Sequence, residues 1–419
     1  MRVLHVSVNE SRGGAGRAAN RLHLALLQAG VDSHMYVQER SSPSARVHSA
    51  AGKLGRGLEA LRPTLEELPL RLFAPAGRGR FTPAWLPDRL ASVVRQLQPD
   101  VVHLHALAKG FVRIESLRRI RPPLVWTLHD MWALTGGCFH SGECRGYQER
   151  CGNCPILESR AENDLSRWVW RRKRRAWRGL KINLVAPSRW MAEKAAQSAL
   201  FVGNAATVIP NGLDLAQFAP LEAGFARQAL GLDPQQRYVL FCAVRPSANP
   251  YKGFARLPEI FARLNALGWQ GRVELLLVGE APAEALTPIP AAARALGGLG
   301  DAAALRLAYC AADALVAPSQ IDNLPNTVME ALACGTPAAA FGVGGIPEMI
   351  EHQETGWLAT PGDAAGLADG LDWLLSDPAR LAGLRRAARA SAQRKYDTRQ
   401  QARACLDLYQ ELLAVDERG

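Results

Sequence analysis

Two acidic residues, Asp322 and Glu330, stand eight positions apart in the stretch of this chain where binding chemistry is easiest to see. Each carboxylate suits the recognition of hydroxyl groups. Turn-forming residues at 323–325 give way to a helical run that begins near Asn326 or Thr327. Because a helix N-terminus presents free backbone N–H groups and the positive end of its dipole, the stretch predicts a diphosphate site between two hydroxyl acceptors.

Four of the eight cysteines fall close together, with the spacing C-x5-C-x6-C-x2-C: Cys138, Cys144, Cys151 and Cys154. Four thiolates in such a loop can surround a tetrahedral Zn²⁺ and so order a segment that cannot bury a core of its own. We therefore expect a structural zinc site. Disulfides and free thiols are the alternatives, and nothing else in the chain suggests the electron transfer that an iron–sulfur cluster would serve.

The segment 167–181, RWVWRRKRRAWRGLK, interleaves tryptophans with Arg and Lys. This pattern suits a helix at an anionic membrane interface, and it would also suit nucleic acid. A charged surface helix with buried tryptophan anchors is the plainer alternative. Residues 1–190 carry 31 Lys and Arg against 15 Asp and Glu, whereas the rest carries 19 against 24, so the basic charge is concentrated in this half.

Short apolar runs alternate with helical periods along the chain, which predicts parallel sheets covered on both faces. Strands are expected at 2–8, 100–104, 124–128 and 183–186, and again at 206–209, 238–243, 274–278 and 314–316. We read an α/β protein with two doubly wound domains, 1–205 and 206–385. The segment 386–419 is expected to carry a helix that packs back on the first domain. Ligands of such sheets lie beyond the carboxyl ends of the strands, so a cleft between the domains is the expected site.

Residues 40–90 are rich in Arg, Pro and Gly, and their sequence assigns no role to them. No apolar run approaches the roughly 18 residues that span a bilayer. The N-terminus reads as a strand rather than a signal peptide, so we expect a cytoplasmic protein.

The sequence from Glu330 to Pro337, EALACGTP, resembles glycosyltransferase family 4, whose mark is Glu, seven residues, Glu and then Ala-x-Ala-Cys-Gly-x-Pro. Asp322 stands where the family usually has the first Glu, one methylene shorter. The resemblance covers nearly the whole chain and implies the two-domain GT-B fold, retention of anomeric configuration, and no metal for the chemistry itself.

The resemblance also implies a set of donor-site residues. Arg245 and Lys252, in VRPSANPYKGF, would neutralise the leaving diphosphate, and Asp322 would hold the transferred sugar. The glycine loop at 12–16 would approach the donor phosphates. The remaining donor-binding candidates are Gly13, Gly14, Gly279, Gly298, Asn323, Leu324, Pro325, Asn326, Thr327 and Glu330.

On the acceptor side, His129 follows the strand LVWTL and resembles the family's active-site histidine, which would orient the sugar. Asp130 follows it directly, and His103 and His105 end another strand. We expect His105 and Asp130 to border the acceptor.

The expected activity is transfer of a sugar from a UDP- or GDP-sugar to a glycan acceptor in bacterial exopolysaccharide or lipopolysaccharide synthesis. The acceptor would be linked to undecaprenyl diphosphate, and the enzyme would sit on the inner face of the cytoplasmic membrane. A GT-B epimerase or phosphorylase is one alternative. A zinc-containing, basic nucleic-acid-binding protein is another, although the greater part of the chain argues against nucleic acid as a partner.

Overall fold

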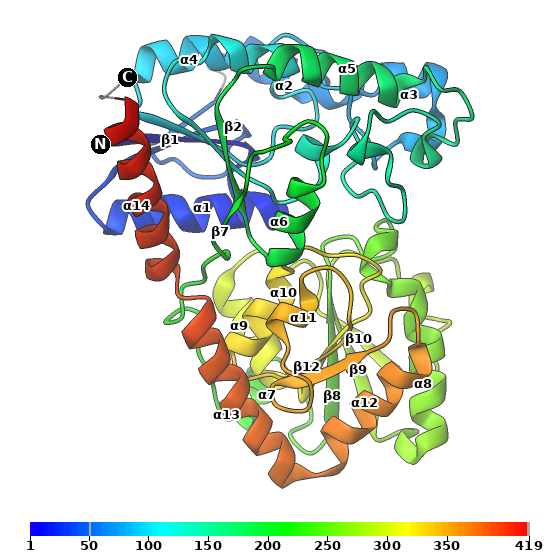
Figure 1. Cartoon of the computed structure of the whole chain (residues 1–419). Helices are drawn as coiled ribbons and strands as arrows, with labels where there is room; N and C mark the ends of the chain where they lie inside the picture. The colour runs from blue at the N-terminus through cyan, green and yellow to red at the C-terminus, as the bar shows by residue number, and fades with distance from the viewer. Residues whose placement is uncertain (50–51, 417–419) are drawn as a thin grey trace. The chain divides into compact units, whose positions relative to one another are not determined.

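The computed structural model describes residues 1–49 and 52–416. The chain divides into two compact units, one formed by Met1–Gly212 with the segment from Arg399 onward, the other by Leu213–Thr398. Each unit is built around a parallel sheet flanked by helices (Figure 1). No helix in the described ranges is both long and apolar enough to span a bilayer.

The first unit contains a seven-stranded sheet in the order β3-β2-β1-β4-β5-β6-β7. Its strands are β1 (Arg2–Asn9), β2 (Asp32–Glu39), β3 (Val47–His48), β4 (Val101–Leu104), β5 (Leu124–Thr127), β6 (Ile182–Ala186) and β7 (Thr207–Val208). Its helices are α1 (Gly13–Gln28), α2 (Gly52–Glu66), α3 (Leu68–Phe73), α4 (Leu90–Leu97), α5 (Leu165–Trp177), α6 (Arg189–Ala196) and α14 (Thr398–Asp416).

The second unit contains a six-stranded sheet in the order β10-β9-β8-β11-β12-β13. Its strands are β8 (Arg237–Cys242), β9 (Val273–Val278), β10 (Ala292–Ala295), β11 (Ala314–Ala317), β12 (Ala338–Phe341) and β13 (Gly356–Ala359). Its helices are α7 (Ala223–Ala229), α8 (Leu257–Leu264), α9 (Ala302–Ala311), α10 (Asn326–Ala333), α11 (Ile346–Met349), α12 (Ala364–Ser376) and α13 (Pro378–Lys395).

Successive residues of β8 belong to different apolar cores, which shows that the second sheet is covered on both faces. Tyr238 and Leu240 pack in one core, and Val239 and Phe241 pack in the other. Side chains of a strand alternate between the two faces, so a strand buried on both sides reads as the continuous apolar run seen in the sequence. The prediction of two doubly wound α/β halves is confirmed.

The prediction that the strand at 206–209 belongs to the second sheet is wrong. Its residues Thr207 and Val208 form β7, which pairs with Val185 and Ala186 of β6 and closes the first sheet. The second sheet starts only at β8. Periodicity alone does not show which neighbour a short strand will choose.

The C-terminal segment is shared between the units. Helix α13 stays in the second unit, whereas α14 returns to the first, where Ala402, Cys405 and Tyr409 pack against Leu22 and Leu26 of α1. The weakly periodic stretch 40–90 contains β3, α2 and α3, apart from residues 50 and 51, which lie outside the described ranges.

Candidate active site

Lys252 and Asp322, seventy positions apart, meet in the second unit. Lys252 Nζ lies 2.5 Å from Oδ2 of Asp322, and Ser319 Oγ lies 3.4 Å from the same oxygen. The two side chains are 30% and 15% exposed, so the pair stands at the protein surface and can be reached by a ligand. The structure thus brings together a predicted phosphate-binding cation and a predicted sugar-binding acid.

Two glycines let the loops around this pair approach closely. Gly253 has a φ of +71°, and a Cβ there would lie 1.7 Å from the carbonyl oxygen of Pro318. Gly344 has a φ of +59°, and a Cβ there would lie 1.7 Å from the carbonyl oxygen of Asp322. Only glycine combines this left-handed backbone with such an approach. Gly253 therefore allows the close approach of the loops that positions Lys252.

Helix α10 begins four residues after Asp322. Its N-cap residue is Pro325, and no side chain caps its first turn. Asn323, Leu324 and Pro325 are buried, whereas Asn326 and Thr327 are half-buried. The predicted helix start is thus confirmed, and the N–H groups of its first turn are a suitable place for an anion.

Glu330 lies one turn into α10 and is 0% exposed. The hydroxyl of Tyr309, from α9, donates a hydrogen bond to Oε2 of Glu330 at 2.8 Å. Burial and the neighbouring Cys242 and Glu330 raise the pKa of Tyr309, which keeps it a hydrogen-bond donor. Tyr309 was not predicted, and its only sequence signal is a polar group on the apolar face of a helix.

The other predicted residues of this unit lie on loops at the carboxyl ends of strands. Gly279 follows β9 with a φ of +141°, and its N–H donates to the carbonyl of Gly297 at 2.9 Å. Gly298 is exposed in the loop after β10. Arg245 is exposed after β8, and its side chain makes no hydrogen bond or ion pair with any residue in the described ranges. The structure does not join Arg245 to the Lys252–Asp322 pair.

In the first unit, Gly13 and Gly14 form the start of α1 directly after β1. Gly13 has a φ of +70°, and both residues are exposed. A Cβ on Gly16 would lie 2.9 Å from the carbonyl oxygen of Asn9, so this glycine lets the helix start close to the strand. The arrangement is a strand-to-helix turn of the kind that binds phosphates.

His129 and His105 lie together beyond the ends of β5 and β4. His105 Nδ1 is 3.1 Å from His129 Nε2, and His105 Nε2 is 3.0 Å from Nδ1 of His5, on β1. Burial lowers the pKa of His129 to about 4, so its ring is neutral at pH 7. His5 was not predicted. The register that places His5 opposite His103 brings it into this cluster.

Asp130 points into the loop that follows β5. Its Oδ1 accepts a hydrogen bond from the backbone N–H of Trp132 at 2.7 Å, and burial raises its pKa to about 6. Lys173 of α5, also unpredicted, is 0% exposed and donates to the carbonyl oxygens of Trp132 and Thr135. Its Nζ stands 3.7 Å from the centre of the Trp132 ring. Lys173 thus holds the segment between His129 and the cysteines.

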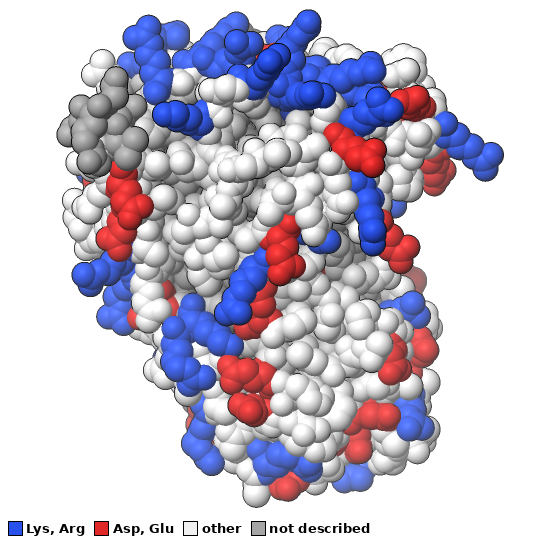
Figure 2. Space-filling model, viewed as in Figure 1, with Lys and Arg blue, Asp and Glu red and all other residues white. Residues whose placement is uncertain are grey.

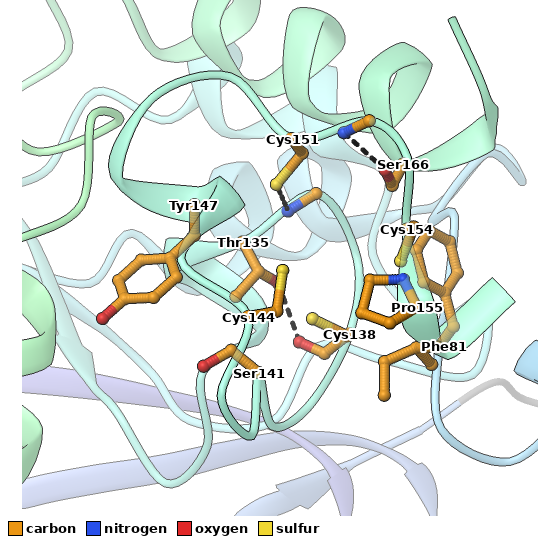
Figure 3. A pocket seen from close by; sticks show the side chains of 13 residues that line it. Phe81, Thr135, Cys138, Ser141, Cys144, Tyr147, Cys151, Cys154, Pro155 and Ser166 are labelled. Carbon is orange, nitrogen blue, oxygen red and sulfur yellow. Dashed lines mark hydrogen bonds between the residues drawn. The ribbon is translucent and has the colours of Figure 1, made fainter. Parts of the chain in front are cut away.

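All four clustered cysteines line one pocket, together with Phe81, Tyr147 and Ser166 (Figure 3). All eight cysteines of the chain are free thiols. Backbone N–H groups of Gly136 and Gly146 point at Sγ of Cys151 and Cys144, at 3.2 and 3.4 Å. Burial raises the pKa of Cys138 and Cys151 to about 12.

The four sulfurs are nevertheless more widely spaced than the ligands of a bound ion. Among the described residues, the only group of three His, Cys, Asp or Glu whose ligand atoms lie within 4.8 Å of one another is His5, His103 and His105. The residue set suits zinc, and the present separation of the sulfurs does not.

Most of the basic segment lies on α5, a charged surface helix with buried tryptophan anchors. Trp170 and Trp177 are buried, so these two are core anchors, whereas Trp168 is 45% exposed beneath the guanidinium of Arg172. Lys and Arg gather over the helices of the first unit, around α4 and α5 (Figure 2). Leu72 and Phe73 at the end of α3 are 72% and 79% exposed.

Comparison with known proteins agrees with this arrangement. Residues 12–217 match the family described as Glycosyltransferase Family 4, and residues 236–377 match Glycosyl transferases group 1. The chain is 27% identical over 357 residues to the colanic acid biosynthesis glycosyl transferase WcaC of Escherichia coli K12, covering 81% of this chain and 83% of that protein.

Solved structures with the same fold include sucrose-phosphate synthase from Thermosynechococcus elongatus, with a TM-score of 0.70 and 22% identity over 99% of both chains. HepE from Anabaena, in complex with UDP-glucose, gives a TM-score of 0.64 and 18% identity over 98% of this chain and 100% of that one. The two Rossmann-like sheets therefore form a GT-B fold, the architecture of nucleotide-sugar glycosyltransferases. The chain belongs to glycosyltransferase family 4, within the group 1 glycosyl transferases.

Proposed function

We propose that this glycosyltransferase moves a sugar, with retention of anomeric configuration, from a UDP- or GDP-sugar to a lipid-linked glycan in bacterial polysaccharide synthesis. The observation that carries the proposal is the contact between Lys252 Nζ and Asp322 Oδ2, just before the uncapped start of α10. Colanic acid synthesis, in the name of the relative WcaC, supports a polysaccharide product, and the UDP-glucose of HepE supports the donor class.

The donor diphosphate is placed against the first-turn N–H groups of α10, Lys252 and Arg245. The bond between the anomeric carbon and the β-phosphate oxygen breaks, and its electron pair stays on the diphosphate. Lys252 and Arg245 neutralise the charge that develops there, since preorganised cations act most strongly where charge appears. The acceptor hydroxyl oxygen attacks the same face of the sugar, and its proton passes to an oxygen of the leaving phosphate.

Asp322 holds sugar hydroxyls and stabilises positive charge near the anomeric carbon. Glu330 is proposed to bind the ribose hydroxyls, with one of its oxygens fixed by Tyr309. Because Glu330 is 0% exposed, ribose binding requires a local opening around α10. His129 orients the sugar from the first unit, and His105 and Asp130 border the acceptor.

A measurement of product stereochemistry tests this proposal. Proton NMR of the product formed from an α-linked UDP-sugar should show an α linkage, and donor consumption should rise strongly when a glycan acceptor is added. A β-linked product would refute retention. Donor conversion to an epimer without acceptor would support the epimerase alternative, and release of sugar phosphate by inorganic phosphate would support a phosphorylase.

We also propose that the first unit docks on anionic lipid through α5 and the end of α3. Basic residues with exposed Trp168, Leu72 and Phe73 combine charge attraction with apolar insertion. Docking would then bring the enzyme to the membrane face that carries the lipid-linked acceptor. Vesicles with anionic lipid should retain the protein, and Leu72→Ser with Phe73→Ser should reduce retention. Equal retention by neutral vesicles would contradict docking by charge.

Zinc is proposed as a structural ion held by Cys138, Cys144, Cys151 and Cys154. A tetrathiolate zinc site carries two net negative charges. Burial lowers the pKa of the fully buried Lys173 to about 7, whereas thiolates at Cys138 and Cys151 would raise it, so such a site would hold Lys173 as its counter-cation. The ion would draw the sulfurs together and order the loop that follows His129. It takes no part in the transfer.

A further inference from the structure

Three histidine rings form a continuous hydrogen-bonded row in the first unit. His5 Nδ1 lies 3.0 Å from His105 Nε2, and His105 Nδ1 lies 3.1 Å from His129 Nε2. The rings are inclined to one another by 31° and 23°. His5 lies on β1, and His105 and His129 follow the ends of the neighbouring strands β4 and β5, so the parallel sheet sets their spacing.

The rings of this row are neutral. His5 and His105 are 0% and 4% exposed, and no carboxylate contacts either ring among the described side chains. The other titratable groups packed against them are His23 of α1 and His103 of β4, whose rings lie 6.1 and 5.3 Å from that of His5. Burial first, and then His103, lower the pKa of both His5 and His105 well below the ordinary value. Each neutral imidazole has one N–H and one acceptor nitrogen.

A neutral row can run in only two directions, and its buried end chooses between them. Nε2 of His5 is buried and has no hydrogen-bond partner in the described part of the chain. If His129 donated to His105 and His105 to His5, the proton of His5 would sit on that nitrogen as a buried N–H without an acceptor. Orphaned buried N–H groups are rarer in proteins than unpaired acceptors. The opposite direction leaves only a lone pair unpaired.

We propose that His5 and His105 are positioning residues that fix His129 as its Nδ1–H tautomer. His5 Nδ1–H donates to His105 Nε2, and His105 Nδ1–H donates to His129 Nε2. The second nitrogen of His129 therefore carries a proton and is a hydrogen-bond donor, as the proposed contact with a sugar oxygen requires. The tautomer follows from the row alone, whereas its use on a sugar rests on the proposed function.

Metal binding is the competing reading of the same rings. The ligand atoms of His5, His103 and His105 lie within 4.8 Å of one another. His103, however, uses Nδ1 with the Tyr409 hydroxyl at 2.5 Å and Nε2 with Thr127 Oγ1 at 2.7 Å. Both nitrogens of His105 are used within the row. An ion would have to break these bonds, so the structure favours the row.

Long-range ¹H–¹⁵N spectra of the full-length protein, labelled with ¹⁵N-histidine, test the proposal. His129 is assigned by the loss of its signals in His129→Gln. The expected result is a single Nδ1–H form of His129, which becomes a mixture with Nε2–H in His5→Phe. His48→Phe is the matched control, because His48 belongs to the same sheet and stacks on His34 outside the row. An Nε2–H form in the wild type, no change in His5→Phe, or a change on adding EDTA would overturn the proposal.

His105→Leu and His105→Asn provide a second pair if His5→Phe does not fold. The amide of Asn can keep an N–H near the position of Nδ1, so His129 should keep its tautomer in His105→Asn and lose it in His105→Leu. The kcat of UDP-glucose hydrolysis should fall at least tenfold in His105→Leu, with little change in KM, and recover in His105→Asn. A tautomer change without loss of kcat would refute the proposed role of His129 and leave the row intact; an unchanged tautomer in His105→Leu would refute the row.

Discussion

Lys252 Nζ lies 2.5 Å from Asp322 Oδ2, so the proposed donor site holds its cation and its acid in contact. The contact depends on Gly253 and Gly344, which let their loops approach the carbonyls of Pro318 and Asp322. A donor diphosphate must compete with Asp322 for Lys252. Binding would release this carboxylate toward the sugar, which couples recognition of the two parts of the donor.

Asp322→Asn should lower the kcat for sugar transfer by about 10² to 10³-fold, because it removes a charge placed where charge develops. Asp322→Glu keeps the charge and lengthens the side chain by one methylene, so it should retain more activity than Asp322→Asn. Steady-state kinetics with a UDP-sugar measure both. Asp369→Asn is the matched control, since it breaks an exposed ion pair with Arg263 on the same unit. Equal losses in Asp322→Asn and Asp369→Asn would refute the assignment.

Tyr309→Phe should destabilise the second unit by about 1–3 kcal/mol, because it removes the hydrogen bond that the Tyr309 hydroxyl donates to the buried carboxylate of Glu330. It should also raise the KM for donor if Glu330 binds ribose. Urea unfolding followed by fluorescence measures the stability. The loss of stability in the double variant Tyr309→Phe with Glu330→Gln should be smaller than the sum of the losses in the two single variants, as expected for contacting partners. Full additivity would show that the two side chains do not interact.

The sequence alone predicted the features that depend on local pattern. Both parallel sheets and the start of α10 follow from periodicity and turn chemistry. Tyr309, Lys173 and His5 were missed because each acts through a partner far away in the chain. The histidines His5, His103 and His105 in two apolar runs were the available signal for the row. Only the register of the two strands shows that they lie side by side.

Other errors arose where local patterns are weak. β7 is two residues long, and its choice of β6 as partner depends on tertiary packing. Helices α2 and α3 carry several exposed leucines, which blur the contrast between an apolar and a polar face. The predicted roles of Arg245, Gly298 and the 12–16 loop are contacts with a ligand, and they remain predictions.

Acidification should destabilise the first unit between about pH 6.5 and 4. His23, His103 and His129 have pKa values lowered to about 4, 3 and 4, and those of His5 and His105 are lowered well below the ordinary value, chiefly by burial. A lowered histidine pKa contributes stability above the unfolded value of 6.5, and that stability is lost as pH falls toward the folded value. Each such group contributes about 1.4 kcal/mol per pH unit.

Asp130 opposes this trend, because its pKa is raised to about 6 and its stabilising effect is lost as pH rises through that value. Burial also raises the pKa of Glu59 and Glu66 in this unit, and it lowers the pKa of His34 and His48. Three carboxyls therefore act against seven histidines, so the net loss on acidification should remain. Thermal unfolding followed by tryptophan fluorescence measures it. Stability that stays constant from pH 7 down to about 4.5 would contradict neutral burial of the histidines.

Zinc binding should release about four protons per ion at neutral pH, because metal-bound cysteines are thiolates and burial raises the pKa of the free Cys138, Cys151 and Cys154. Titration of chelator-treated protein with Zn²⁺ in weak buffer, with a pH indicator, measures the release. Cys144→Ser should lower both the release and the affinity, whereas Cys405→Ser, in α14, is the control. Less than one equivalent of zinc in freshly purified protein, with no proton release on titration, would refute the site.

The most direct test of the central claim is donor binding measured by thermal shift and calorimetry with UDP-, GDP- and dTDP-sugars. If Lys252 neutralises the leaving diphosphate, sugars of one nucleotide class should stabilise the wild type. Lys252→Ala should lose about 2.7–4 kcal/mol of transition-state stabilisation, measured as a fall in kcat/KM. Arg256→Ala, which removes a cation from the same segment, should behave as wild type. Binding and turnover of the preferred donor that are unchanged in Lys252→Ala, or no binding of any of the three donors, would contradict the account.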